Sequence, residues 1–183
     1  MKEGGKVSKL EHKYLPEFVY GGIDGSVTTF AVVCGAIGAS LSSVVVLILG
    51  FANLFGDGFS MAISNYLSTK SEKELHPKHR YSPGKDPVKT AWATFISFMV
   101  IGLIPLISFI LAAIFKNSIL IENQFTYSFV LTGFALLIVG ALKGEIVGKH
   151  PGKSAVETLI IGGIAAALAF GVGYFVKSLL SWM

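Results

Sequence analysis

The sequence has few charged residues and a single cysteine, and both shortages restrict the class of protein. Charged residues make up 14% of the 183 residues, against about 25% in soluble domains, whereas apolar residues make up 52%. The lone Cys34 has no partner within the chain for a disulfide, which excludes a small disulfide-stapled domain. Together with a mean hydropathy of +0.67, this composition indicates a polytopic membrane protein.

Several features of other function classes are also missing. Residues 1–17 are polar, and the apolar run after them is too long and too acidic for the core of a signal peptide, so we expect the first hydrophobic segment to be retained. No HExxH or nucleophile motif occurs, and no histidine lies centrally in an apolar run, which argues against an enzyme. The net charge of +4 comes from lysines that flank apolar runs, so no nucleic-acid partner is expected.

Five apolar stretches are long enough to cross a bilayer, which takes about 20 residues each. We expect an all-α fold, because open strands cannot satisfy their backbone hydrogen bonds in lipid. The third stretch is long and contains Pro105, which predicts a kink or a tilt. The five predicted spans, which form one transmembrane domain over residues 1–183, are residues 18–39, 43–67, 88–115, 125–142 and 155–180.

The basic residues are concentrated on one side of this predicted domain. Thirteen of the fifteen Lys and Arg residues lie in the N-terminal segment, in or just after the loop 69–87, or around the connection between the last two spans. The positive-inside rule places these three segments in the cytoplasm. The N-terminus is then cytoplasmic, and the C-terminus, after an odd number of spans, lies outside or in a lumen.

Polar side chains inside the first two predicted spans carry the strongest functional signal. A carboxylate in the hydrocarbon core of a bilayer has a high free-energy cost, so such groups usually face a bundle interior or a water-filled path. At about 1.5 Å per residue, Asp24 lies about 10 Å and Asp57 about 15 Å from the cytoplasmic ends of their spans. The short connection 40–42 makes these spans antiparallel neighbours, and Met61 lies one turn from Asp57 on the same face. The three side chains can therefore meet.

Further polar residues extend this arrangement in both directions. Asn53 and Asn65 continue the stripe of the second span by one turn each, and Glu17 lies two turns before Asp24 at the cytoplasmic entrance. Carboxylate and amide oxygens suit hard divalent cations such as Mg²⁺ and Mn²⁺, and a thioether adds a soft ligand useful for Fe²⁺. The predicted metal-binding residues are Glu17, Asp24, Asn53, Asp57 and Met61.

Other interpretations of the same residues stay open. The stripe could pack against a partner, which would make the chain a non-transporting membrane subunit or an assembly protein. Six glycines, three around Asp24 and three around Asp57, predict close helix packing, although a crowded carboxylate is also what an ion path needs. The acidic residues and histidines at 72–79 are interleaved with lysines, which favours a solvated loop over a metal site.

The motifs of the first two spans resemble the vacuolar iron transporter family. Residues 17–30, EFVYGGIDGSVTTF, are similar to its first span, and residues 50–61, GFANLFGDGFSM, are similar to its second. Shorter likenesses occur at residues 102–106 and 162–167. The resemblance covers nearly the whole chain from Glu17 onward.

The resemblance implies a fold, an activity and a set of functional residues. It implies five transmembrane helices, a homodimer with the ion path between its subunits, and export of Fe²⁺, sometimes Mn²⁺, from the cytosol in exchange for protons. Asp24 matches the family's first-span aspartate, Glu17 matches the acidic residue seven positions earlier, and Met61 matches the second-span methionine. Many members have Glu where this chain has Asn53, and Asp57 often has no acidic counterpart.

A second departure from the family concerns the cytoplasmic loop. Plant and yeast-type members carry a long, Glu-rich, metal-binding insertion between the second and third spans, and about twenty residues fill that gap here. The chain therefore resembles a short form without a cytosolic metal store. This points to a prokaryotic protein of the plasma (inner) membrane, although a vacuolar membrane would give the same topology relative to the cytosol.

The chemistry of a membrane carboxylate suggests how such a site would work. A carboxylate withdrawn from water holds its proton more tightly, and metal binding requires the deprotonated form. Alternate occupation by metal and by protons would give an exchanger without ATP or covalent chemistry. The expected partners are a divalent metal ion, protons, the bilayer and a second copy of the chain, with no resident cofactor.

Overall fold

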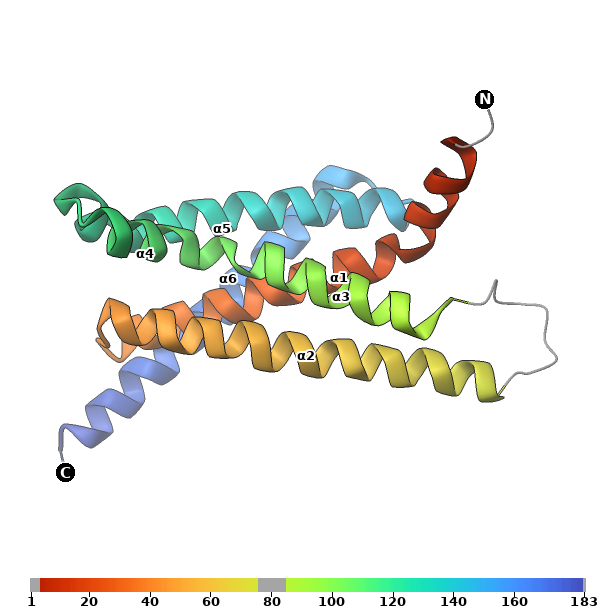
Figure 1. Cartoon of the computed structure of the whole chain (residues 1–183). Helices are drawn as coiled ribbons and strands as arrows, with labels where there is room; N and C mark the ends of the chain where they lie inside the picture. The colour runs from red at the N-terminus through yellow and green to blue at the C-terminus, as the bar shows by residue number, and fades with distance from the viewer. Residues whose placement is uncertain (1–3, 76–84, 183) are drawn as a thin grey trace.

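The structure, a computed structural model, describes residues 4–75 and 85–182, with side chains from Lys13 onward. Every regular element in this part of the chain is an α-helix, which confirms the predicted all-α class. The six helices, labelled in Figure 1, are α1 (Gly4–Gly38), α2 (Ser43–Leu75), α3 (Pro87–Gly102), α4 (Ile104–Phe115), α5 (Ser118–Ile146) and α6 (Pro151–Leu180).

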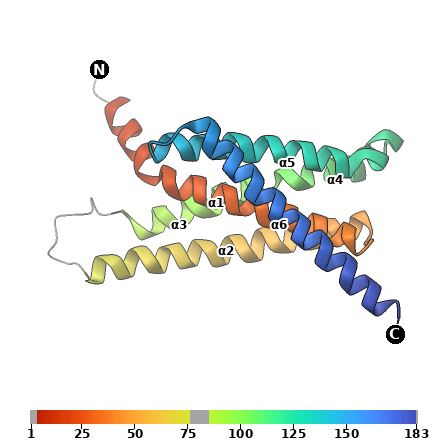
Figure 2. The same cartoon turned by 180° about the vertical axis from the view of Figure 1, so that it is seen from behind.

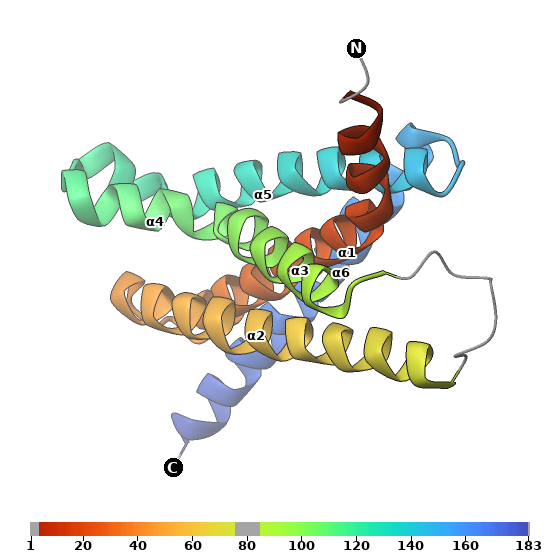
Figure 3. The same cartoon turned by 45° about the vertical axis from the view of Figure 1, so that its right-hand side comes forward.

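The helices run back and forth between two ends of an elongated bundle. The start of α1, the end of α2, the start of α3 and the α5–α6 connection gather at one end, on the right of Figure 1 and again in Figure 3. Among the described residues, four helices are long and apolar enough to cross a membrane, and the bent pair α3–α4 can serve as a fifth span. The polytopic membrane architecture predicted from hydropathy is thereby confirmed.

The third predicted span is broken at the place where its proline lies. Helices α3 and α4 meet at an angle of 50° across Leu103. Pro105 has no N–H to bond the carbonyl of Ile101, one helical turn before it, and the Ser26 hydroxyl of α1 donates to that carbonyl instead at 3.3 Å. The predicted kink is confirmed, and a neighbouring helix supplies the hydrogen bond that the proline removes.

Several helices are longer than the spans predicted from hydropathy. Helix α2 continues through residues 69–75, so the predicted cytoplasmic segment 69–87 begins with helix. No proline or glycine lies between Thr69 and Leu75, and Lys70 pairs with Glu74 one turn away at 3.9 Å. The remaining loop residues 76–84, with His76 and His79, lie outside the described part of the chain.

Helix α5 also starts earlier than expected. It begins at Ser118, seven residues before the predicted span, because Asn117 caps it. The Asn117 side chain accepts a hydrogen bond from the Ile119 N–H at 2.9 Å, which satisfies one of the free donors of the first turn. Hydropathy locates the apolar part of a helix, whereas capping residues locate its ends.

Helix α1 lies at the centre of the bundle and contacts all five other helices. Of the most apolar window of α1, 56% is buried, against 11% for α6. Figures 1 and 2 show the reason: α6 crosses the bundle obliquely, and its C-terminal half extends away from the other helices.

The main core cluster combines Val33 of α1, Leu54 of α2, Phe98 of α3 and Leu106 of α4. A large apolar surface of α2 and α6 is left uncovered within one chain.

The glycines around the two aspartates mostly serve helix packing. A Cβ atom at Gly25 would lie 2.6 Å from the backbone oxygen of Phe98, so only glycine allows α1 to approach α3 this closely. Gly21, Gly22, Gly50 and Gly58 likewise face neighbouring helices within van der Waals distance. Gly56 alone of these six has nothing within 4 Å of the position of a Cβ. The packing interpretation of these glycines is confirmed for five of the six.

Candidate metal site

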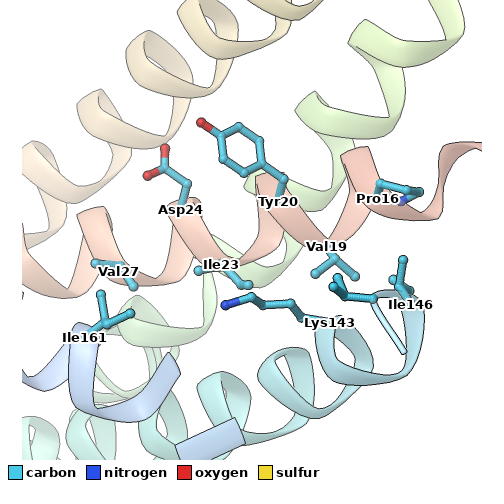
Figure 4. A pocket seen from close by; sticks show the side chains of 10 residues that line it. Pro16, Val19, Tyr20, Ile23, Asp24, Val27, Lys143, Ile146 and Ile161 are labelled. Atoms are coloured by element: carbon cyan, nitrogen blue, oxygen red, sulfur yellow. The ribbon is translucent and has the colours of Figure 1, made fainter. Parts of the chain in front are cut away.

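Asp24 lies on α1 and Asp57 on the neighbouring helix α2. Both are half-buried, and the charge of Asp57 is close enough to act on Asp24. Figure 4 shows the side chains of Tyr20 and Asp24 pointing from α1 toward the side of α2. Within the described residues, neither carboxylate belongs to an ion pair. Two acidic groups without a basic partner in the described part of an apolar bundle are the candidate cation ligands of this chain.

The position of Asp24 follows from the packing of α1. The glycines at positions 21 and 25 let α1 lie directly against the backbone of α3, and Ser26 and Thr29 beside them are fully buried. Asp24 falls between these packed positions and the α2 side of the helix. The close α1–α3 contact therefore leaves Asp24 half-buried on the part of α1 that faces α2, rather than in the core.

Asn53 connects α2 to α1 and is already engaged through its amide nitrogen. It donates to the hydroxyl oxygens of Thr28 at 3.3 Å and Thr29 at 3.2 Å. The Thr28 hydroxyl in turn donates to the backbone carbonyl of Asp24 at 2.8 Å. Asn53 therefore holds the two helices together one turn from Asp57, and this role does not depend on a metal.

Asn65 does not continue the stripe toward α1. Its amide nitrogen donates to the hydroxyl of Thr94 on α3 at 2.6 Å. Equal spacing along α2 predicted both asparagines in one row, but Asn53 bonds α1 and Asn65 bonds α3. The polar stripe is therefore divided between two neighbouring helices.

Met61 has a packing role whatever else it does. Its side chain is half-buried and packs against the cluster that contains Leu54 and Phe98. Met61 lies one turn from Asp57 on α2, so the two side chains share one face of the helix. Met61 can therefore contribute a soft ligand only from a side chain that already belongs partly to the core.

Glu17 is engaged at the start of α3 rather than beside Asp24. One of its oxygens, Oε1, forms an ion pair with the Lys85 ammonium. The other oxygen, Oε2, is buried and has no hydrogen-bond partner in the described structure. Next to this pair, the backbone N–H of Asp86 donates to the Tyr14 hydroxyl at 3.0 Å. Glu17 thus lies where α1 and the segment before α3 meet.

A pocket of about 360 Å³ opens on the surface of α1 next to Asp24. Its polar lining residues are Asp24, Tyr20 and Lys143, and the rest is apolar. Figure 4 shows Lys143 reaching toward α1 from α5, on the opposite side of α1 from the Asp24 carboxylate. Lys143 also lies 3.7 Å from Glu157 of α6. The sequence analysis missed both Tyr20, which helical spacing from Asp24 could have found, and Lys143, which no local pattern could.

One copy of the chain supplies an incomplete set of metal ligands. In residues 4–75 and 85–182, no three His, Cys, Asp or Glu side chains gather closely enough to hold a metal ion. Asp24, Asp57 and Met61 would offer two carboxylates and one thioether, whereas hard divalent cations take about six ligands. A metal ion bound by these three residues would need further ligands.

Comparison with known proteins gives a consistent result. The sequence model of the VIT family matches residues 15–82 and 74–174, and the two matched segments meet at the connection between the second and third predicted spans. The Toxoplasma gondii vacuolar iron transporter is 29% identical over 221 aligned positions, which cover 87% of this chain and 73% of that protein. Vacuolar iron transporter 1 of Eucalyptus grandis is 26% identical, with 88% and 86% covered.

The relatives are longer than this chain within the aligned region. The alignment with the Toxoplasma gondii protein spans 221 positions, more than the 183 residues here, so that relative has segments that this chain lacks. Vacuolar iron transporter 1 of Arabidopsis thaliana is 27% identical over 212 positions, with 84% of this chain and 82% of that protein covered. Because the family model matches most of its length, this chain belongs to the VIT family of vacuolar iron transporters.

Proposed function

We propose that this chain carries Fe²⁺, with Mn²⁺ as a second cargo, out of the cytosol in exchange for protons. The observation that carries this proposal is the pair Asp24 and Asp57, half-buried on adjacent helices without a basic partner in the described chain. The names of the relatives, all vacuolar iron transporters, support iron as the cargo.

The exchange follows from the charge of the pair. Two ionised carboxylates balance one divalent cation, and two protons balance them equally well when the cation has left. Metal binding needs the deprotonated oxygens, so loading the metal releases protons. Met61 would favour a later transition metal over Ca²⁺ or Mg²⁺, because a thioether is a poor ligand for hard cations. Glu17 would collect the cation at the cytoplasmic entrance, and Asn53 would lie on the exit side.

A homodimer would complete the site. One chain leaves apolar side chains of α2 and α6 exposed, among them Phe55, Phe59, Leu168 and Phe175. A second copy packed beside α1 and α2 would bring a second pair of carboxylates and a second thioether to the same ion path. The incomplete ligand set of one chain supports this arrangement.

The proposed topology places the N-terminus in the cytoplasm. The described parts of the three lysine-rich segments border the end of the bundle where α1, α3 and α6 begin (Figure 3), and the positive-inside rule assigns that end to the cytosol. The shortness of the chain relative to its relatives favours a prokaryotic plasma (inner) membrane over a vacuolar one. Export from the cytosol is the direction common to both membranes.

Flux measurements in proteoliposomes test the proposal directly. Purified protein is reconstituted with a pH-sensitive dye inside, a pH gradient is imposed, and uptake of Fe²⁺, Mn²⁺, Zn²⁺ and Ca²⁺ is compared. We expect gradient-dependent uptake of Fe²⁺ and Mn²⁺ with matching proton movement, and none for Asp24→Ala.

Two outcomes would contradict the proposal in different ways. Metal flux without proton movement would leave a transporter but remove the exchange. Absence of any flux from folded wild-type protein would favour the alternative of a non-transporting subunit, in which Asp57→Asn and Met61→Leu disturb binding of a partner protein instead.

A further inference from the structure

The ion pair between Glu17 and Lys85 joins two regions that the sequence separates by 68 positions. Glu17 is the carboxylate assigned above to the cytoplasmic entrance, and its side chain is 12% exposed. The Lys85 side chain is 32% exposed, so the ammonium lies at the boundary between the bundle and water. This pair therefore differs from an ordinary surface salt bridge, whose two partners are both solvated.

Lys85 occupies only half of the Glu17 carboxylate. Its ammonium contacts Oε1, whereas Oε2 is buried without a hydrogen-bond partner in the described chain. A buried carboxylate oxygen without a partner costs free energy, and a divalent cation could contact both oxygens. The carboxylate is thus neutralised by a tethered cation but still has an unused ligand atom.

The segment that carries Lys85 is held against α1 independently of this ion pair. The next residue, Asp86, donates its backbone N–H to the Tyr14 hydroxyl at 3.0 Å. The Asp86 side chain also caps α3 by accepting from the Val88 N–H at 2.9 Å. Because these contacts fix the backbone, the flexible Lys85 side chain can leave Glu17 without displacing the start of α3.

We propose that Lys85 is a specificity-determining residue: a tethered counter-ion that competes with the incoming divalent cation for Glu17 at the entrance. A bound metal would displace the ammonium into water, and the ammonium would return when the metal moves on toward Asp24. Lys85 therefore weakens metal binding at the entrance and prevents the first carboxylate from retaining the cargo. This inference rests on the proposed function.

The test is a calorimetric Mn²⁺ titration of purified full-length protein in nanodiscs, with flux measured in parallel. Lys85→Gln removes the competing charge, and we expect it to lower the Mn²⁺ dissociation constant about tenfold. This is the size of effect expected when one unit positive charge, partly screened by water, no longer repels a divalent ion. Lys85→Arg keeps the charge and should bind Mn²⁺ like the wild type. Lys89→Gln, an exposed lysine four residues on, removes the same net charge and serves as the matched control for the general field.

The Glu17→Gln background identifies the carboxylate on which Lys85 acts. In that background Lys85→Gln should leave Mn²⁺ affinity unchanged, because the contested ligand is gone. A merely structural pair would instead lower the thermal stability in both single variants without any gain in affinity. Unchanged or weaker Mn²⁺ binding by folded Lys85→Gln would overturn the inference.

The two readouts separate this inference from the proposed function. Wild-type flux together with an unaltered affinity in Lys85→Gln would reject the counter-ion role alone. Absence of wild-type flux would reject transport, and the titration would still decide whether Lys85 competes for Glu17. Equal gains in affinity for Lys85→Gln and Lys89→Gln would also overturn the specific role.

Discussion

The two sides of α1 use neighbouring residues for opposite purposes. Toward α3, Gly21 and Gly25 bring the backbones into contact, and Ser26 is fully buried. The hydroxyl of Ser26 donates a hydrogen bond to the Ile101 carbonyl, which Pro105 leaves without its helical partner. Toward α2, the half-buried Asp24 has no such partner in the described chain. The hydroxyls of Thr28 and Thr29 on the α2 side are also satisfied, by Asn53, so it is the Asp24 carboxylate that remains available.

This difference shows which polar residues of a membrane bundle to regard as functional. The Ser26 hydroxyl between α1 and α3 completes the hydrogen bonding of a broken helix, so its burial reflects packing. The half-buried carboxylates of Asp24 and Asp57 cost free energy that no described contact recovers, so their presence needs another explanation. The contrast predicts that substitutions on the α3 side change the fold and that substitutions on the α2 side change transport.

The largest effect is expected from Gly25→Leu on the packed side. The new Cβ would lie 2.6 Å from the Phe98 carbonyl oxygen, and backbone atoms cannot yield as a side-chain end can. We expect a loss of more than about 3 kcal/mol of stability, seen as lost expression or a collapsed gel-filtration profile in detergent. Gly56→Leu, at a glycine with no neighbour within 4 Å, should remain folded. Equal behaviour of the two variants would contradict the close α1–α3 contact.

The next largest effect is expected from Asp24→Asn on the open side. The amide removes a ligand charge and a proton site but keeps the shape, so metal flux should fall to the level of protein-free liposomes. Thermal stability should stay the same or rise, because one of two neighbouring like charges is gone. Glu122→Gln, an exposed carboxylate on α5, should leave flux unchanged. Normal flux in Asp24→Asn would remove this residue from the metal path.

A smaller and more selective effect is expected from Met61→Leu. Leucine preserves the apolar packing against Leu54 and Phe98, so the fold should tolerate it with a loss below about 1.5 kcal/mol. Loss of the thioether should reduce Fe²⁺ flux more than Mn²⁺ flux, because the softer ligand favours the later metal. Competition between the two ions in one vesicle preparation measures this ratio. An unchanged ratio would assign Met61 to packing alone.

The smallest effect is expected from Asn53→Ala, which tests the connection between the two sides. It removes the hydrogen bonds to Thr28 and Thr29, and interhelical bonds of this kind contribute about 0.6 kcal/mol on average. Asn65→Ala, which removes one shorter bond to Thr94 of α3, is the matched variant. Both should show small, similar losses in a denaturant titration in detergent. Flux lost in Asn53→Ala but retained in Asn65→Ala would give Asn53 a role in the path.

Parts of this structure were predictable from local pattern. Spans can be located from hydropathy, because the thickness of hydrocarbon imposes a length on any apolar helix, and Pro105 indicates the break of the third span. Helical spacing and a tight connection between antiparallel helices predict that Asp24, Asp57 and Met61 meet, and in the structure the charge of Asp57 acts on Asp24. Helix ends were predicted less well: α2 extends to Leu75 and α5 begins at Ser118, because capping and ion pairs, not hydropathy, decide where helices stop.

Composition, periodicity and motif by themselves determined that the chain is an all-α membrane protein with two carboxylates inside its first two spans. Only the tertiary structure decided what each polar side chain contacts. Lys85 contacts Glu17, and Ser26 contacts Ile101. The residues of each pair are far apart in the sequence, so helical periodicity cannot predict these contacts. Asn53 and Asn65 share a spacing on α2 and bond different helices. The physical reason is that sequence spacing fixes the direction of a side chain on its own helix, whereas the packing of the helices decides which residue of a neighbouring helix that side chain contacts.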